Sequence, residues 1–194
     1  VMENVYHTKE EMIDCVNSFY EGMVQRSEEM KQHPNYKTGE NYAYLGLPPC
    51  FLIFDEYVAF FEMLGVKEST SLLSQLKKIV MLGRQAGYFL IVACQRPDAK
   101  YFSDGIRDNF NFRVGLGRIS ELGYGMLFGS DVKKQFFQKR IKGRGYCDVG
   151  TSVISEFYTP LVPKGHDFLQ TIGSLSQARQ DGTATCEAKG DGTD

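Results

Sequence analysis

The sequence predicts an α/β fold in which a mainly parallel sheet is flanked by helices. Two continuous apolar runs of strand length, Cys50–Phe54 and Phe89–Cys94, support this fold class. Uninterrupted apolar runs are typical of strands buried on both faces, as in parallel sheets covered by helices. A segment with helical periodicity precedes each run, and helix followed by buried strand, twice over, is the α/β pattern.

Composition limits the classes of protein to consider. With 194 residues, 42% hydrophobic and 24% charged, the chain fits one soluble globular domain or part of a larger one. A formal net charge of −2 excludes a basic nucleic-acid arm, so any contact with a polyanion must come from a local patch. The apolar runs are too short to span a membrane, and the N-terminus has no signal-peptide pattern. A membrane anchor outside this chain stays open.

The five cysteines show neither CxxC nor any His/Cys spacing typical of zinc sites. Their odd number and wide scatter argue against a disulfide framework. Free thiols in a reducing cytoplasm are therefore expected. The cysteines are Cys15, Cys50, Cys94, Cys147 and Cys186.

The first helix is expected over Lys9–Gln32. Thr8 and Glu11 have capping-box spacing, in which the hydroxyl accepts an N–H of the first turn and the carboxylate accepts the N–H of the cap residue. Apolar residues then recur at helical spacing. Pro34–Pro49 is expected to be a surface loop, and its length indicates an insertion or a mobile segment.

The remaining elements follow from apolar periodicity and from glycine and proline positions. The glycine-rich stretch after residue 115 is expected to be loosely structured up to about Gly129. Residues 1–170 are expected to form one domain, and residues 171–194 a polar flexible tail or linker. We expect helices over 57–64, 69–86 and 104–109, a strand over 111–116, and an edge strand over 153–158 paired with 145–149.

Asp55 and Glu56 directly follow the first apolar run. In open α/β sheets, ligands lie outside the carboxyl ends of the strands. An acidic residue there can hold Mg²⁺ through water, and its neighbour can orient or deprotonate an attacking water, which is the Walker B arrangement. The alternative is that both residues cap the following helix, whose dipole favours negative charge.

Gln95 follows the second apolar run, where an amide could sense a γ-phosphate; alternatively, it satisfies a turn before Pro97. Arg84 stands near the end of the helix that precedes this run. An exposed arginine there could act on a neighbouring subunit's phosphate as an arginine finger. Its commoner use is charge complementarity at a helix C-terminus.

Taken in order, these features resemble the motor domain of the FtsK/SpoIIIE family of DNA translocases, over about residues 1–163. The ordered set is more specific than any of its members. It comprises Asp55-Glu56, Arg84-Gln85-Ala86-Gly87, Gln95-Arg96-Pro97, Arg107-Asp108-Asn109 and Arg113-Val114.

The resemblance implies a partial RecA-like P-loop ATPase fold and assigns a role to each matched residue. Asp55 would be the Mg²⁺-associated carboxylate, acting through water, and Glu56 the catalytic base. Gln95 would be the phosphate sensor and Arg84 the finger acting in trans. The cofactors implied are ATP and Mg²⁺, and the implied assembly is a homo-hexameric ring.

The resemblance also implies contacts with double-stranded DNA. Arg96 and Arg107 match positions that face DNA in the pore of the family's ring. The second pore loop matches less well, because Glu121 and glycines stand where basic residues are usual, and Arg118 is the candidate substitute. A basic cluster over residues 133–144 is best interpreted as a solvated surface.

One departure from the family pattern is large: no G-x-x-x-x-G-K-[ST] motif occurs in these 194 residues. We therefore expect the C-terminal half of a motor core, inactive by itself. The leading hypothesis is a fragment of an ATP-driven DNA translocase for chromosome segregation or, slightly favoured, conjugative or mobile-element transfer. The alternatives are a secretion-motor ATPase of the same superfamily and a non-enzymatic ATPase-like interaction module.

Overall fold

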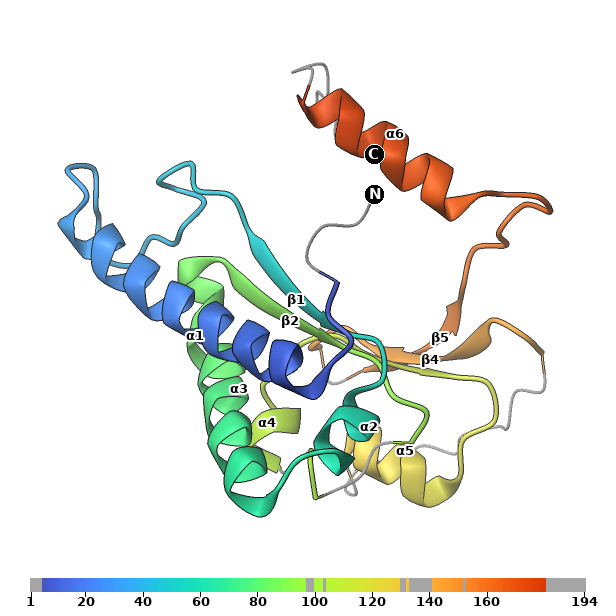
Figure 1. The fold of residues 1–194 in the computed structure, drawn as a ribbon. Coiled ribbons are helices and arrows are strands. Elements are labelled where there is room, and N and C mark those ends of the chain that lie inside the picture. The colour runs from blue at the N-terminus through green and yellow to red at the C-terminus, as the bar shows by residue number, and fades with distance from the viewer. Residues whose placement is uncertain are drawn as a thin grey trace. The chain divides into compact units, whose positions relative to one another are not determined.

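The computed structural model describes residues 5–96, 100–102, 104–129, 132, 141–151 and 153–180, and it divides the chain into two units. The larger unit, Tyr6–Thr159, holds both sheets and all the residues matched to the family motifs (Figure 1). The second unit joins Val1–Val5 with Pro160–Asp194. The helices are α1 (Lys9–Gln32), α2 (Tyr57–Glu62), α3 (Val66–Ala86), α4 (Asp104–Arg107), α5 (Glu121–Phe128) and α6 (Phe168–Gln180). The strands are β1 (Cys50–Phe54), β2 (Tyr88–Val92), β3 (Arg113–Leu116), β4 (Arg144–Asp148) and β5 (Ile154–Tyr158).

The expected parallel pair is present, since β1 and β2 run parallel with Cys50 opposite Tyr88 and Phe54 opposite Val92. Leu52 and Phe54 are buried in the main core, on the side where α1 and α3 contact each other. The other face differs from expectation, because Phe51 and Ile53 are 55% and 65% exposed. The described part of the chain therefore covers one face of the pair and not both.

Helix α1 begins and ends where the sequence predicts. Thr8 Oγ1 accepts from the N–H of Glu11 at 3.3 Å, and Glu11 Oε2 accepts from the N–H of Thr8 at 3.2 Å, which completes the capping box. The buried residues Val16, Met23 and Met30 recur every seven positions, so they lie along one stripe of the helix that joins the main core.

The loop between α1 and β1 has structure of its own. Backbone hydrogen bonds from Leu45 and Leu47 to the carbonyl of Tyr42 form turns within it. Tyr42, Leu45 and Leu47 pack against the main core. The long segment is thus anchored through three apolar side chains.

Strands β3, β4 and β5 form a separate antiparallel sheet in that order, with the expected pairing of β4 and β5. A correction concerns the segment after β3, expected to be loosely structured: Glu121–Phe128 forms α5. Ser120 caps this helix by accepting from the N–H of Gly123, and Tyr124 and Phe128, one turn apart, are buried. Their burial outweighs the low helix propensity of the two glycines.

In the second unit, α6 covers Phe168–Gln180, so the first ten residues of the expected flexible tail are helical. Residues 181–194 lie outside the described residues. Helix α6 lacked a clear signal because its apolar residues are few. Among the described residues, no helix is long and apolar enough to cross a bilayer.

Candidate functional site

The carboxyl ends of β1 and β2 bring the acidic pair and Gln95 to one edge of the sheet. Beyond the last register pair, the N–H of Ala93 donates to the carbonyl of Phe54 at 2.8 Å, and the N–H of Tyr57 donates to the carbonyl of Ala93 at 3.0 Å. The N–H of Gln95 then donates to Glu56 Oε2 at 3.3 Å. The two strand ends are therefore joined through the Glu56 carboxylate.

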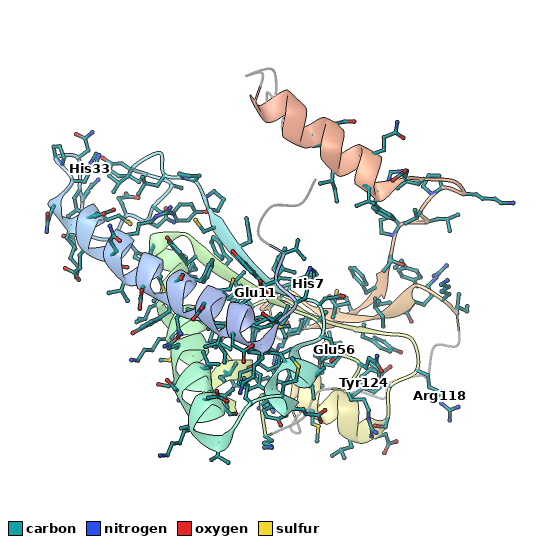
Figure 2. All side chains as sticks on the ribbon, in the orientation of Figure 1. His7, Glu11, His33, Glu56, Arg118 and Tyr124 are labelled. Carbon is teal, nitrogen blue, oxygen red and sulfur yellow. The ribbon has the colours of Figure 1, made fainter. Side chains whose placement is uncertain are left out.

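This contact bears on the alternative in which the acidic pair caps α2. Glu56 occupies the N-cap position of α2, yet its side chain makes no capping hydrogen bond. It reaches across to the end of β2 instead, and it lies at the start of α2 in Figure 2. Glu56 therefore makes no side-chain cap hydrogen bond to α2, although its charge still lies at the N-terminus of that helix, where the dipole favours it.

An aromatic cluster packs next to this edge, around the start of α2. Tyr57 is 1% exposed, and its ring lies 5.5 Å from that of Phe54 and 4.6 Å from that of Phe102, centroid to centroid. Its hydroxyl donates to the carbonyl of Tyr101 at 3.4 Å. Burial raises the pKa of Tyr57 far above its ordinary value, and an electrostatic interaction with Cys94 raises it further, so the phenol stays neutral. The start of α2 is thereby held firmly under Glu56.

Cys94 lies beside the acidic pair on the β2 side. Burial, and then the charge of Glu56, raise the pKa of the Cys94 thiol. The thiol therefore stays protonated at neutral pH. The four cysteines within the described residues are free, as the sequence predicts; they are Cys15, Cys50, Cys94 and Cys147.

Arg84 lies at the other end of the parallel pair. It is exposed in the last turn of α3, which ends at Ala86, just before β2 begins at Tyr88. At about 3.3 Å per residue, the two ends of β1 are about 13 Å apart. Within one chain, Arg84 and the acidic pair therefore stand at opposite ends of the sheet.

The three arginines expected at DNA lie on different segments. Arg96 is exposed directly after Gln95, and Arg118 is exposed between β3 and α5, where Figure 2 shows it pointing outward. Arg107, at the end of α4, pairs with Asp108 at 3.2 Å and has a side chain 21% exposed. Residues 133–140 of the basic cluster lie outside the described residues, and Arg144 in β4 stacks on the ring of Tyr158.

The donor set at the edge suits a hydrated hard cation and not a protein-only metal cage. Within the described ranges, no group of three or more His, Cys, Asp or Glu side chains is placed to share a metal ion. Asp55 is exposed, and with Glu56 it offers two adjacent carboxylates. Mg²⁺ is commonly held by one or two carboxylates together with substrate phosphates and water, so these residues fit that mode.

Comparison with known proteins identifies the family. No family model matches the chain. The chain is 53% identical over 192 residues to the FtsK domain-containing protein YdcQ of Bacillus subtilis (strain 168). The resemblance to the FtsK/SpoIIIE family is confirmed. The matched region makes up 99% of this chain and 40% of YdcQ, so the chain spans less than half the length of this relative.

Solved structures confirm the partial RecA-like fold expected for a member of this family. The conjugation coupling protein TcpA of pCW3, solved with ATPgS, matches with a TM-score of 0.63 at 18% identity, over 84% of this chain and 49% of that chain. The cytoplasmic domain of the type VII secretion ATPase EccC from Thermomonospora curvata matches with a TM-score of 0.60 at 20% identity. The match covers 84% of this chain and 19% of that chain. EssC (ATPases 2 and 3) from Geobacillus thermodenitrificans matches with a TM-score of 0.54 at 16% identity. The match covers 89% of this chain and 31% of that chain.

Sequence reasoning missed two features of the site. It did not foresee the hydrogen bond between Gln95 and Glu56, which joins residues 39 positions apart. It also did not treat the apolar residues of α2 as a support for the acidic pair. The signal was the i, i+3, i+4 spacing of Tyr57, Phe60 and Phe61, all of them buried.

Proposed function

We propose that this chain is part of an ATP-driven motor that moves double-stranded DNA. The observation that carries the proposal is the hydrogen bond from the backbone N–H of Gln95 to Glu56, which brings Gln95 and the acidic pair to one sheet edge. Asp55 is the carboxylate that would hold Mg²⁺ through water, and Mg²⁺ when bound would neutralise charge on the phosphate oxygens. Gln95 is the group that would sense the γ-phosphate.

Glu56 is the proposed catalytic base. One of its oxygens accepts the N–H of Gln95, which fixes the carboxylate at the strand ends. The other oxygen can accept a hydrogen bond from a water and take its proton as the water attacks the γ-phosphorus and ADP leaves. Because Glu56 is tied to the backbone of Gln95, a change in phosphate contacts at Gln95 reaches the base directly.

Arg84 is the proposed finger for a neighbouring copy, since it stands at the far end of the sheet from its own acidic pair. An interface that joins the Arg84 end of one copy to the Asp55 edge of the next is heterologous, and such an interface forms a ring when the rotation between copies closes. A homo-hexameric ring, as expected from the family, satisfies this geometry.

Arg96, Arg107 and Arg118 are the proposed DNA contacts. Arginine contacts with phosphates are independent of sequence and weaken with salt. Between the roles open to such a motor, we favour conjugative or mobile-element transfer over chromosome segregation, on the long 34–49 loop and the divergent segment around Glu121. A motor that moves protein is the outcome expected if DNA has no effect.

The test uses the intact protein. Glu56→Gln should lower ATP hydrolysis by about 10²–10⁴-fold while ATP binding is kept. Glu62→Gln, an exposed carboxylate at the end of the same helix, is the matched control and should leave hydrolysis unchanged. Loss of ATP binding in Glu56→Gln, or equal effects of both variants, would contradict the assignment of the base.

The substrate is tested separately. DNA should stimulate ATP hydrolysis, and the double change Arg96→Ala with Arg107→Ala should weaken DNA binding and flatten its dependence on salt. The expected change in the slope is about 1 to 2 released counterions. An unchanged slope would mean that these arginines do not touch phosphate, and a rate indifferent to DNA would favour the secretion-type motor.

A further inference from the structure

The end of α3 that carries Arg84 is bound to the loop between α1 and β1. The N–H of Tyr42 donates to the carbonyl of Gln85 at 3.0 Å. In return, the Gln85 side-chain amide donates to the carbonyl of Glu40. The residue next to Arg84 is thus tied to the loop through both its backbone and its side chain.

The carbonyls in the last turn of a helix lack partners within the helix, and an unsatisfied end frays. Here the neighbouring segments supply donors. Besides the Tyr42 contact, the N–H of Cys50 donates to the carbonyl of Gly87 at 2.7 Å. Arg26 Nη1 donates to the carbonyl of Ala86 at 3.4 Å. The helix end beneath Arg84 is therefore fixed from outside α3.

The ring of Tyr42 strengthens this attachment. Gly87 ends α3 in the left-handed conformation, with φ of 78°, and a Cβ built there would lie 2.6 Å from the Tyr42 ring. The ring also meets Phe89 edge-on, with centroids 5.9 Å apart. The loop is itself anchored in the core by Leu45 and Leu47.

The side of α3 that carries Arg84 is exposed, although the Lys77 side chain on it lies close to Gly105 of α4. Met81, one turn before Arg84, is 52% exposed, and Lys77, one turn earlier, is also exposed. The spacing i, i+4, i+7 places these three on one stripe of the helix. An apolar centre between two basic groups suits an acidic partner surface, and the Asp55–Glu56 edge of another copy is acidic.

We propose that Gln85 and Tyr42 are positioning residues for Arg84, and that residues 40–42 act as a strap that presents it to a second copy of this chain. This inference rests on the proposed function, in which Arg84 acts in trans. The strap holds the last turn of α3 still, so only the Arg84 side chain, and not the backbone that carries it, has to be ordered when it meets the neighbour's nucleotide. A loop of unusual length thereby gains a function between subunits.

The strap itself is tested by hydrogen exchange on the intact protein. Gln85→Met keeps the length and helix propensity of the side chain but removes the donor. It should speed exchange of the peptide that contains Tyr42 while the peptides of α1 and β2 keep their protection. Tyr42→Ala should do the same, whereas Tyr42→Phe keeps the ring and should match the wild type. Unchanged exchange in Gln85→Met would overturn the strap.

The trans role is tested by mixing variants that are each impaired in hydrolysis. Gln85→Met should lower kcat by about ten- to a hundred-fold with KM for ATP kept. Assemblies of Gln85→Met with Glu56→Gln subunits should regain activity, because the intact Arg84 end of the latter serves the intact site of the former. Random one-to-one mixing restores up to about a quarter of the sites, since half the subunits keep the base and half of their neighbours keep the finger.

A parallel mixture of Arg84→Ala with Glu56→Gln separates this inference from the function on which it rests. Recovery in both mixtures supports both. Recovery with Arg84→Ala but not with Gln85→Met would show that Gln85 serves its own subunit's fold, which overturns the positioning role. No recovery with Arg84→Ala would overturn the trans action of Arg84 itself.

Discussion

Gly83 shows how a single residue sets the distance between α3 and β2. It is buried, and a Cβ built on it would overlap the carbonyl oxygen of Tyr88, a backbone atom that cannot turn away. The absence of a side chain thus lets the helix end lie directly against the start of the strand. The position of Arg84, the next residue, depends on this close packing.

Gly83→Ala should therefore destabilise the chain by about 1–3 kcal/mol, the usual cost of overpacking. The matched control is Gly125→Ala in α5, where no heavy atom lies within 4 Å of the added Cβ. There the change should stabilise by about 0.5–1 kcal/mol, because alanine loses less conformational entropy in a helix. Urea unfolding of both variants measures the difference, and equal signs would contradict the packing account.

At the residue scale, the sequence predicts the edge but not its internal contact. Asp55, Glu56 and Gln95 each follow an apolar run, and the carboxyl ends of parallel strands meet, so their convergence is foreseeable. The direction of the Glu56 side chain is not foreseeable, because the same sequence fits a carboxylate that caps α2 and one that accepts from Gln95. That choice depends on how the two strand ends pack.

At the scale of elements, the starts of α1 and α3 are joined by an ion pair. Lys9 Nζ lies 2.8 Å from Glu68 Oε2, and the N–H of Gly65 donates to the same carboxylate oxygen at 2.7 Å. The Lys9 hydrogen bond, and then that of Gly65, lower the pKa of Glu68 below its usual value of 4.5. One exposed side chain thus both caps α3 and ties it to α1.

A lowered carboxylate pKa stabilises the fold above the unfolded value near 4.5, and this contribution is lost as pH falls through the lowered pKa. Glu68→Gln should therefore reduce stability at pH 7 and have little effect at pH 2. Urea unfolding at both pH values, with and without Lys9→Met, measures this. In the Glu68→Gln background, Lys9→Met should cost less than it does alone. A pH-independent difference would contradict the account.

The antiparallel sheet contains a more deeply buried pair. Arg113 Nη2 lies 2.6 Å from Asp148 Oδ2, with the side chains 18% and 5% exposed. Asp148 also accepts the N–H of Gly150, and Arg113 donates to the carbonyl of Leu127 near the end of α5. The pair therefore joins β3, β4 and α5.

Asp148→Ala should cost about 3–5 kcal/mol, because it leaves the Arg113 charge buried without its partner. Glu28→Ala breaks the exposed pair with Lys31, whose side chains are 62% and 57% exposed, and should cost less than about 1 kcal/mol. Thermal unfolding of the two variants compares them directly. A similar cost for both would show that burial of Asp148 does not set its contribution.

Elements with strong local signals were predictable, and those fixed by distant packing were not. Helix α1 has a complete capping box, and β1 lies between Pro49 and the acidic pair, so both were predicted with their true bounds. The glycines of α5 argue against a helix, which forms because Tyr124 packs against Tyr146 of β4. No local sequence pattern predicts that contact, because its two residues lie far apart in the chain.

At the scale of the whole molecule, the parallel pair exposes an apolar face. Phe51, Ile53 and Ile91 are 55%, 65% and 47% exposed, and the register places Ile53 opposite Ile91. Parallel sheets are normally covered on both faces, and a pair of strands presents two unpaired edges. The isolated 194-residue chain should therefore self-associate.

Sedimentation over a range of concentrations tests this. The double change Ile53→Lys with Ile91→Glu places opposite charges across the strand pair and should shift the chain toward monomer. Val66→Lys, at a residue 86% exposed at the start of α3, is the control and should leave association unchanged. If association is unchanged by the Ile53 and Ile91 substitutions but weakened by Val66→Lys, the surface that self-associates lies on α3.

The isolated chain should also bind ATP only weakly, with a dissociation constant above about 1 mM, which corresponds to about −4 kcal/mol. Asp55 and Glu56 offer the metal and water side of a nucleotide site. The backbone N–H cradle and lysine that hold phosphates in P-loop ATPases belong to a G-x-x-x-x-G-K-[ST] segment, which these 194 residues lack. Without a bound triphosphate, two carboxylates are too few to retain Mg²⁺, which loses its water reluctantly.

Calorimetry with ATP and Mg²⁺ measures the affinity of the isolated chain for ATP, and the intact protein is the positive control. Stoichiometric micromolar binding by the isolated chain, lost on Asp55→Ala, would mean that another segment of this chain cradles the phosphates.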